Sequence, residues 1–203
     1  MLHSALNRLL GNPDLHLLDQ ILKGRYEPPM RLLDAGCGEG RNLPYFVRND
    51  FDVWGVDTNA TALRLLRLQG KAWSPAFDPE KFIQGDVAEL PFPPAAFDAV
   101  VCCAVLHFAR DEAHFFRMTD ELLRVLKPSG SLFIRMNASV GEFSGWVSTD
   151  EQSLLLNDET RFLLTPALVE QLAKRYSFTW LEPMRTELVA GEQAQTTLIL
   201  QKS

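Results

Sequence analysis

Three glycines at alternate positions, Gly36, Gly38 and Gly40, stand between two acidic residues that could bind a ligand. Asp34 precedes the first glycine, and Asp57 follows the last one after a second apolar run. Glycine is required where the backbone adopts positive φ or approaches a ligand more closely than a Cβ atom permits. An acidic residue about 20 residues beyond such glycines binds ribose hydroxyls in α/β folds. The pattern therefore predicts a loop that binds a nucleoside-containing ligand.

Short apolar runs must form the strands that position these residues. The runs of strand length cover residues 31–35, 51–56, 81–84, 97–105 and 131–136. Apolar residues at helical spacing lie between the runs, over about 41–48, over 60–69 and from 111 onward. Alternating strands and helices are typical of a parallel sheet covered on both faces. A final pair of runs, 178–189 and 196–201, predicts antiparallel closing strands.

Five motifs in a fixed order carry a family resemblance. They are Asp34-Ala-Gly-Cys-Gly-Glu-Gly40, Gly55-Val-Asp57, Gln84-Gly-Asp86, the run from Phe97 to His107 and Leu126-Lys-Pro-Ser-Gly130. This series resembles the motifs of the class I S-adenosylmethionine-dependent methyltransferases, in particular small bacterial members, with some likeness to tellurite-resistance-type enzymes. The resemblance implies an α/β, Rossmann-like, seven-stranded mixed sheet with helices on both faces. Its expected strand order is 3-2-1-4-5-7-6, with the last strand antiparallel.

The same resemblance implies S-adenosyl-L-methionine as the cofactor and S-adenosyl-L-homocysteine as its product. Asp57 is expected to accept hydrogen bonds from both ribose hydroxyls, since a carboxylate offers two acceptor oxygens. Asp86 is expected to accept one from the adenine amine, with the backbone of Val87 facing the ring. Asp34 is expected to order the loop or to reach the methionyl amino group through water. The residues implied for the cofactor are Asp34, Gly36, Cys37, Gly38, Gly40, Asn42, Asp57, Thr58, Asp86, Val87 and Ala104.

Methyl transfer from a sulfonium depends mainly on positioning, which supplies about 7–11 kcal/mol in well-oriented systems. A general base is required only where the acceptor must lose a proton. His107, just beyond the fourth strand, is the catalytic candidate, and the alternative is a histidine packed beside Phe108. A metal site built from His107, Asp111 and His114 is not expected, because only two of them share a helix face.

The acceptor is expected above the fourth and fifth strands, because ligands of open α/β sheets bind beyond the carboxyl ends of the strands. Residues 137–165 interrupt the strand–helix alternation, and a linking segment of this length is often functional. The candidate acceptor residues are Arg135, Asn137, Trp146, Arg161 and Phe162.

A chain of 203 residues suits one domain. Within it we expect an N-terminal helical lid or edge helix at 1–27, a cofactor-binding core at 28–136, and an acceptor-side loop, helix and closing strand pair at 137–203. A net charge of −6 argues against a nucleic-acid substrate and favours a small neutral or cationic acceptor. The chain shows neither a membrane-length apolar run nor a signal-peptide pattern, which predicts a cytoplasmic protein without membrane contact.

Other functions share some of these residues. A nicotinamide-dependent oxidoreductase would keep the strand, the glycine loop and the ribose acid, but its fingerprint has Gly or Ala where this chain has Arg41. A non-catalytic adaptor that binds the cofactor would keep all of them, and aminopropyl transfer from the decarboxylated cofactor is a further alternative. The residues leave open the acceptor, the methylated atom, and the choice between monomer and homodimer.

Overall fold

The computed structural model describes residues 10–139, 153–156, 159–189 and 193–203. The strands are β1 (Arg31–Ala35), β2 (Asp52–Asp57), β3 (Phe82–Gln84), β4 (Phe97–Cys103), β5 (Leu126–Asn137), β6 (Ser153–Leu156), β7 (Glu159–Phe162), β8 (Phe178–Trp180), β9 (Arg185–Val189) and β10 (Gln193–Lys202). The α-helices are α2 (Leu15–Leu22), α3 (Pro44–Arg48), α4 (Ala60–Trp73), α5 (Glu112–Val125) and α6 (Pro166–Arg175). Two short 3₁₀ helices are η1 (Pro79–Lys81) and η2 (Leu106–Phe108).

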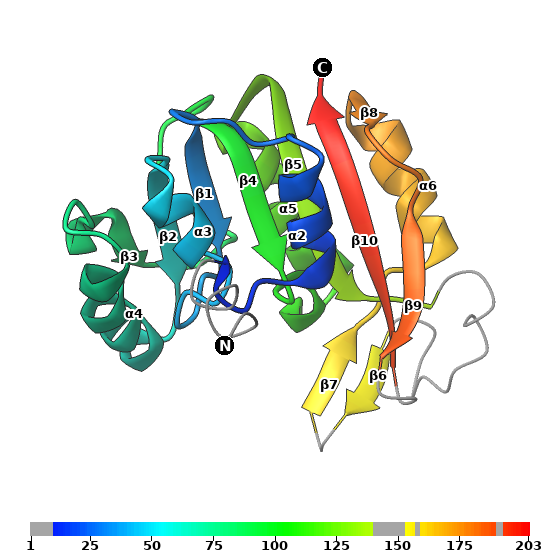
Figure 1. The fold of residues 1–203 in the computed structure, drawn as a ribbon. Coiled ribbons are helices and arrows are strands. Elements are labelled where there is room, and N and C mark those ends of the chain that lie inside the picture. The colour runs from blue at the N-terminus through cyan, green and yellow to red at the C-terminus, as the bar shows by residue number, and fades with distance from the viewer. Residues whose placement is uncertain (1–9, 140–152, 157–158, 190–192) are drawn as a thin grey trace.

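One mixed sheet organises the molecule, with helices on both of its faces (Figure 1). The strand order is β3-β2-β1-β4-β5-β10-β8, and β9 also pairs with β10. The strands from β3 to β5 are parallel, whereas β10 runs antiparallel to β5. The predicted Rossmann-like α/β fold, its strand order and its antiparallel last strand are confirmed.

The sheet has eight strands rather than the expected seven, because the penultimate strand is divided in two. β8 pairs with one end of β10 and β9 with the other half. The residues between them include Pro183, which has no N–H to donate to a strand ladder. The segment predicted as one strand over 178–189 is therefore β8, a break and β9.

Each face of the sheet buries its own apolar cluster. On one face Leu17 of α2, Phe46 of α3 and Leu66 of α4 pack together. On the other face Phe115 of α5 and Leu168 of α6 do the same. Burying one such side chain contributes about 1.5–3 kcal/mol, so both helix layers are held firmly against the sheet.

Two elements are shorter than the sequence predicts, and both differences lie at the carboxyl edge of the sheet. The helix expected from residue 41 begins at Pro44, because the Gly40 N–H donates to the Cys37 carbonyl and the Leu43 N–H to the Gly40 carbonyl, forming turns. β4 ends at Cys103 rather than at 105, because Ala104 has φ of +61°. These turns leave room at the ends of the strands.

The N-terminal helix α2 lies across the face of β4, β5 and β10 (Figure 1). Asp14 caps it by accepting hydrogen bonds from the His16 and Leu17 backbones. The earlier part of the expected N-terminal lid, residues 1–9, lies outside the described residues. Of the helices in the described ranges, none has the length and apolar character needed to cross a membrane.

Candidate functional site

A cavity of about 510 Å³ opens at the carboxyl edge of the sheet. Its volume lies within the range of small-molecule sites, about 300–1,000 Å³. Six of the residues expected to hold the cofactor line it, namely Gly36, Asp57, Thr58, Asp86, Val87 and Ala104. They come from the ends of four neighbouring strands, so the structure brings together residues that are up to 68 positions apart in the chain.

The glycine loop turns sharply at the end of β1. The N–H groups of Gly36 and Cys37 both donate to the Val56 carbonyl, at 2.7 and 3.1 Å. Gly36 has φ of +85°, and a Cβ atom added there would collide with the side chain of Val105. Glycine is therefore required at this position both by the backbone conformation and by the close approach of the segment after β4.

The carboxylate of Asp57 is fixed by two backbone N–H groups. Its Oδ2 accepts from Gly38 at 2.7 Å, and its Oδ1 accepts from Asn59 at 2.8 Å. Each oxygen keeps a second lone pair, which suits a pair of vicinal hydroxyls. The side chain is thus held in one orientation at the cavity wall before any ligand arrives.

Asp34 is buried at the tip of β1, and neither of its carboxylate oxygens has a hydrogen-bond partner. Burial and, to a smaller degree, the charge of Asp57 raise the pKa of Asp34 to about 7, against the opposing effect of Arg41. A buried polar group without a partner is costly and rare in folded proteins. The group therefore fits a ligand that brings a hydrogen-bond donor or a positive charge.

Asp86 lies at the far end of the cavity, where β3 ends. Its Oδ1 accepts the Ala88 N–H at 2.8 Å, and the side chain is otherwise exposed. The negative charge of Asp86 acts to raise the pKa of His114, but burial has the larger effect and lowers it. Asp57 and Asp86 thus place two carboxylates in the lining of one cavity.

Besides Ala104 and Val105, four residues of the lining come from the segment after β4 and from α5. Phe108 is 54% exposed at the cavity mouth, and Arg110 follows it. His114 and Met118, one helical turn apart on α5, complete this side. The sequence analysis predicted a helix from residue 111 but did not place His114 or Met118 at the cofactor, although their i, i+4 spacing puts them on one helix face.

Three further residues expected at the cofactor shape the loop without lining the cavity. Cys37 is buried, and a Cβ atom added at Gly40 would meet Trp73 and Leu66. Asn42 is also buried and accepts the backbone N–H of Asp14 through Oδ1. In the described part of the chain their contacts are with protein groups, and their cofactor roles stay predictions.

The catalytic candidate His107 is buried, and its Nδ1 has no hydrogen-bond partner. Burial and the nearby Arg161 guanidinium lower its pKa to about 4, so the imidazole is neutral at pH 7. Its ring centroid lies 4.7 Å from that of Phe108. The described lining includes Phe108 but not His107, so the role of His107 as a general base stays a prediction.

Two acceptor candidates lie on β7, which packs against η2. The Arg161 guanidinium sits 4.4 Å from the ring centroid of Phe108, at the cavity mouth. The Phe162 ring instead stacks on Phe115 at 5.4 Å in the core. Trp146, the third aromatic or cationic candidate of this segment, lies outside the described residues.

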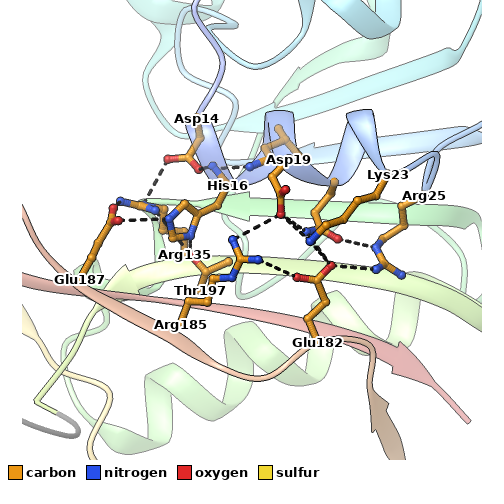
Figure 2. Close-up of polar contacts among 12 residues, drawn as sticks. Asp14, His16, Asp19, Lys23, Arg25, Arg135, Glu182, Arg185, Glu187 and Thr197 are labelled. Atoms are coloured by element: carbon orange, nitrogen blue, oxygen red, sulfur yellow. Dashed lines mark hydrogen bonds and ion pairs between the residues drawn. The ribbon is translucent and has the colours of Figure 1, made fainter.

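The other two acceptor candidates are at the end of β5 and are both buried. Asn137 accepts a hydrogen bond from Gln195 at 3.5 Å. Arg135 contacts four side chains of the protein, which are Asp14, Glu187, Gln195 and Thr197. Figure 2 shows this network beneath α2. An acceptor role for Arg135 stays a prediction, and its protein contacts offer a different one.

A second cavity, of about 420 Å³, lies at the opposite edge of the sheet, where β2 and β3 begin. Phe51, Val53 and Phe82 contribute to its lining. Ligands of open parallel sheets bind at the carboxyl ends of the strands, so this cavity is not the expected site.

A family model described as a methyltransferase domain matches residues 33–134. This match covers half of the chain and includes the glycine loop, both cavity carboxylates and the whole of β4.

Curated relatives match the same region. A phthiotriol/phenolphthiotriol dimycocerosates methyltransferase from Mycobacterium leprae is 31% identical over 118 residues, which are 56% of this chain and 41% of that protein. A 27-O-demethylrifamycin SV methyltransferase from Amycolatopsis mediterranei is 35% identical over 104 residues, or 50% of this chain and 36% of that one. The chain thus matches about two fifths of the length of these relatives.

The fold also resembles that of solved structures. A S-adenosylmethionine-dependent methyltransferase from Methanosarcina mazei has a TM-score of 0.71 and 22% identity, and the alignment covers 90% of this chain and 96% of that one. At this identity the likeness establishes the fold.

Proposed function

The chain belongs to the class I S-adenosylmethionine-dependent methyltransferase family, and we propose that it transfers a methyl group from S-adenosylmethionine to a small-molecule acceptor. The observation that carries this proposal is the fit of the cavity to an adenosyl group. Asp57 is fixed with free lone pairs at the end of β2, Asp86 stands at the end of β3, and Asp34 is buried without a partner. These three carboxylates match a ribose, an adenine amine and a methionyl ammonium in turn.

The cofactor supplies an activated methyl group on a sulfonium. The residues of this chain bind and orient it and keep water away from it. Gly36 and Gly38 bring the backbone close to the ligand, and Ala104 turns the chain after β4 with φ of +61°. A non-glycine residue in this conformation is strained, and such strain is typical of functional sites. Positioning of this kind supplies most of the rate enhancement that in-line displacement requires.

The acceptor is proposed to bind beside Phe108, on the side covered by Arg161. Phe108 lies between the proposed donor and acceptor parts of the site. It lines the cavity, and the Arg161 guanidinium packs over its ring. The net charge of −6 supports a small neutral or cationic acceptor rather than a nucleic acid. His107 is neutral at pH 7, the protonation state of a general base, but its pKa of about 4 makes it a weak one.

The division of the chain follows from the same proposal. Residues 28–136 form the cofactor-binding core, α2 packs on the sheet face over β4, β5 and β10, and 137–203 form the acceptor side. A cytoplasmic location is part of the proposal, and the buried free thiols of Cys37, Cys102 and Cys103 are compatible with a reducing compartment.

Titration calorimetry with S-adenosylhomocysteine tests the cofactor assignment, with NAD and NADP as matched ligands. We expect S-adenosylhomocysteine to bind, and we expect no binding heat with NAD or NADP. Binding of a nicotinamide cofactor alone would instead support an oxidoreductase. A screen of small acceptors that follows formation of S-adenosylhomocysteine then separates an enzyme from a non-catalytic binding protein.

A further inference from the structure

The side chain of Arg135 is the centre of a buried polar network beneath α2. Strand register aligns Arg135 of β5 with Cys103 of β4 on one side and with Thr197 of β10 on the other. This row lies on the sheet face that α2 covers. Arg135 Nε lies 3.2 Å from the Asp14 carboxylate, and both side chains are only 9% exposed.

Asp14 connects this ion pair to the glycine loop. Its carboxylate accepts the His16 N–H at 2.9 Å and pairs with Arg135, while its backbone N–H donates to Asn42 Oδ1 at 2.9 Å. Asn42 is two residues beyond Gly40, the last glycine of the loop. Contacts therefore run without a gap from the end of β5, through the start of α2, to the exit of the loop.

Arg41 provides a second link across the same space. Its guanidinium lies 3.8 Å from Cys103 Sγ and 4.0 Å from the Asp14 carboxylate. The segment between the glycine loop and α3 is thus tied both to the end of β4 and to Asp14. A change in Asp14 acts on this segment at two points, Arg41 and Asn42.

Burial of the Asp14–Arg135 pair argues for a geometric role. Desolvation cancels much of the attraction in a buried ion pair, so such a pair adds little net stability. Removing one partner is nevertheless costly, because among the described residues Asp14 then keeps only Arg41 as an ion-pair partner, at 4.0 Å, and Arg135 keeps only the more exposed Glu187. The pair therefore selects one arrangement of the groups around it rather than serving simply to stabilise the fold.

We propose that Arg135 and Asp14 are positioning residues that hold the exit of the glycine loop in the shape that binds the methyl donor. They do so through the contacts of Asp14 with Asn42 and Arg41. This inference rests on the proposed function for its ligand, but the coupling between the pair and the loop is a property of the ligand-free protein.

The other end of α2 offers a matched control. There Glu182 accepts hydrogen bonds from Lys23, Gln20 and Arg25, and Asp19 pairs with Arg185 at 3.4 Å. Figure 2 shows the two polar clusters at the two ends of the helix. Both clusters hold α2 against the molecule, but of the residues in these two clusters it is Asp14 that contacts Arg41 and Asn42, at the exit of the glycine loop.

The test compares Arg135→Gln and Asp14→Asn with Glu182→Gln. Hydrogen exchange of the amides of residues 36–43 is measured in the ligand-free protein, and the Kd for S-adenosylhomocysteine by calorimetry. We expect the amides of residues 36–43 to exchange about tenfold faster in Arg135→Gln and Asp14→Asn than in the parent. We also expect these variants to bind S-adenosylhomocysteine about tenfold more weakly, because residues that orient a binding group are lost. Glu182→Gln should lower the Tm but leave exchange and Kd within about twofold of the parent.

Kinetics and a conservative variant distinguish positioning from general loss of structure. With any active acceptor, the KM for the donor should rise in Arg135→Gln while kcat at saturating donor stays within about twofold. Arg135→Lys, which can still pair with Asp14, should restore most of the affinity.

Equal effects of Glu182→Gln and Arg135→Gln on exchange and Kd would overturn the proposal, and so would unchanged exchange in Arg135→Gln. If the parent protein fails to bind S-adenosylhomocysteine, the proposed function fails. The exchange comparison still decides whether the Asp14–Arg135 pair is coupled to the glycine loop.

Discussion

Asp57 Oδ2 accepts the backbone N–H of Gly38 at 2.7 Å, so the acid at the end of β2 and the glycine loop after β1 form one unit. Asp57 lies 19 residues beyond Gly38, and its other oxygen accepts the N–H of Asn59. The same carboxylate therefore fixes the loop, shapes the start of α4 and presents lone pairs to the cavity. A substitution at Asp57 acts on the loop and on the ligand together.

Asp57→Asn is expected to weaken binding of S-adenosylhomocysteine by about 10–100-fold, since hydrogen bonds to a charged group contribute roughly 1.5–3 kcal/mol. The amide nitrogen of Asn would also face one of the two backbone N–H donors. Calorimetry measures the Kd. Asp78→Asn is the control, because Asp78 caps η1 by accepting the Glu80 N–H away from the cavity. Equal affinity of the Asp57 variant and the parent would remove the ribose assignment.

Asp34 makes the stability of the ligand-free protein depend on pH. Its pKa is about 7 in the folded protein, above the ordinary value of 3.8, so the folded state binds the extra proton between these values. Stability contributed by this group is therefore present at low pH and decreases as pH rises towards 7, by up to roughly 4 kcal/mol. Asp34→Asn should raise the Tm at pH 8 more than at pH 5.

The same variant should bind S-adenosylhomocysteine more weakly, because the amide lacks the charge that attracts an ammonium group. Parent protein should release protons on binding near pH 7, which calorimetry in two buffers of different ionisation enthalpy detects. If the Tm of Asp34→Asn differed from that of the parent by the same amount at pH 5 and at pH 8, an unpaired Asp34 with a raised pKa would be contradicted.

The loop glycines should differ in their sensitivity to alanine. At Gly36 the new Cβ would collide with Val105, so Gly36→Ala should abolish folding or cost more than about 3 kcal/mol of the free energy of unfolding. At Gly38 the nearest atom to a new Cβ is Asp57 Oδ2 at 4.0 Å, so only the backbone strain at φ of +51°, about 1 kcal/mol, is expected.

Gly38→Ala should therefore fold but lose affinity for the donor, because the added methyl group stands beside Asp57, the carboxylate that we propose binds the ribose. Gly24→Ala is the matched control, since Gly24 has φ of +70° and no atom within 4 Å of the added Cβ. Denaturant unfolding and calorimetry check both variants. Similar donor affinities for the two would show that the cavity does not extend to Gly38.

His107 should contribute to stability with the opposite pH dependence to that of Asp34. Its pKa in the folded protein is about 4, below the ordinary value of 6.5, so stability is present above pH 6.5 and lost as pH falls towards 4. His107→Gln removes this dependence, so the Tm of the parent should fall towards that of the variant over this window. Parallel Tm curves would contradict the buried neutral imidazole.

Activity then decides between the two interpretations of His107. A general base contributes about 10²–10⁴-fold, so a loss of kcat larger than 100-fold in His107→Gln would support proton transfer. A loss below tenfold with lowered Tm would support the alternative, a histidine packed beside Phe108.

Arg161→Ala should raise the KM for the acceptor while leaving the Kd for S-adenosylhomocysteine nearly unchanged. Its guanidinium lies on the Phe108 ring, a contact worth about 0.5–1 kcal/mol at an exposed site. Trp146→Ala, in the same acceptor-side segment of the sequence, should behave alike. Arg175→Ala is the control, because Arg175 lies over Phe116 at 5.0 Å on α6. An equal loss of donor and acceptor binding in Arg161→Ala would reject the acceptor assignment.

Local patterns in the sequence were sufficient for the fold and for six of the residues that line the cavity at the carboxyl edge of the sheet. Strand-length apolar runs, alternate glycines and the acids at strand ends are set by neighbouring residues, so the order of motifs predicted the parallel sheet and the positions of Asp57 and Asp86. Boundaries were less well predicted: the turn residues before Pro44 shortened one helix, and the break around Pro183 divided one strand.

The environments of buried charged groups were decided by the tertiary structure alone. Arg135 was predicted as an acceptor residue from its place at a strand end, yet its closest partners come from residues 14 and 187, on α2's N-cap and on β9. His114 and Met118 line the cavity because α5 packs with that face towards it. Sequence spacing fixes what a residue is and which element carries it, whereas partners and burial depend on which distant elements pack together. For this reason the sequence determined where the glycine loop lies, and only the folded chain decided what holds that loop in place.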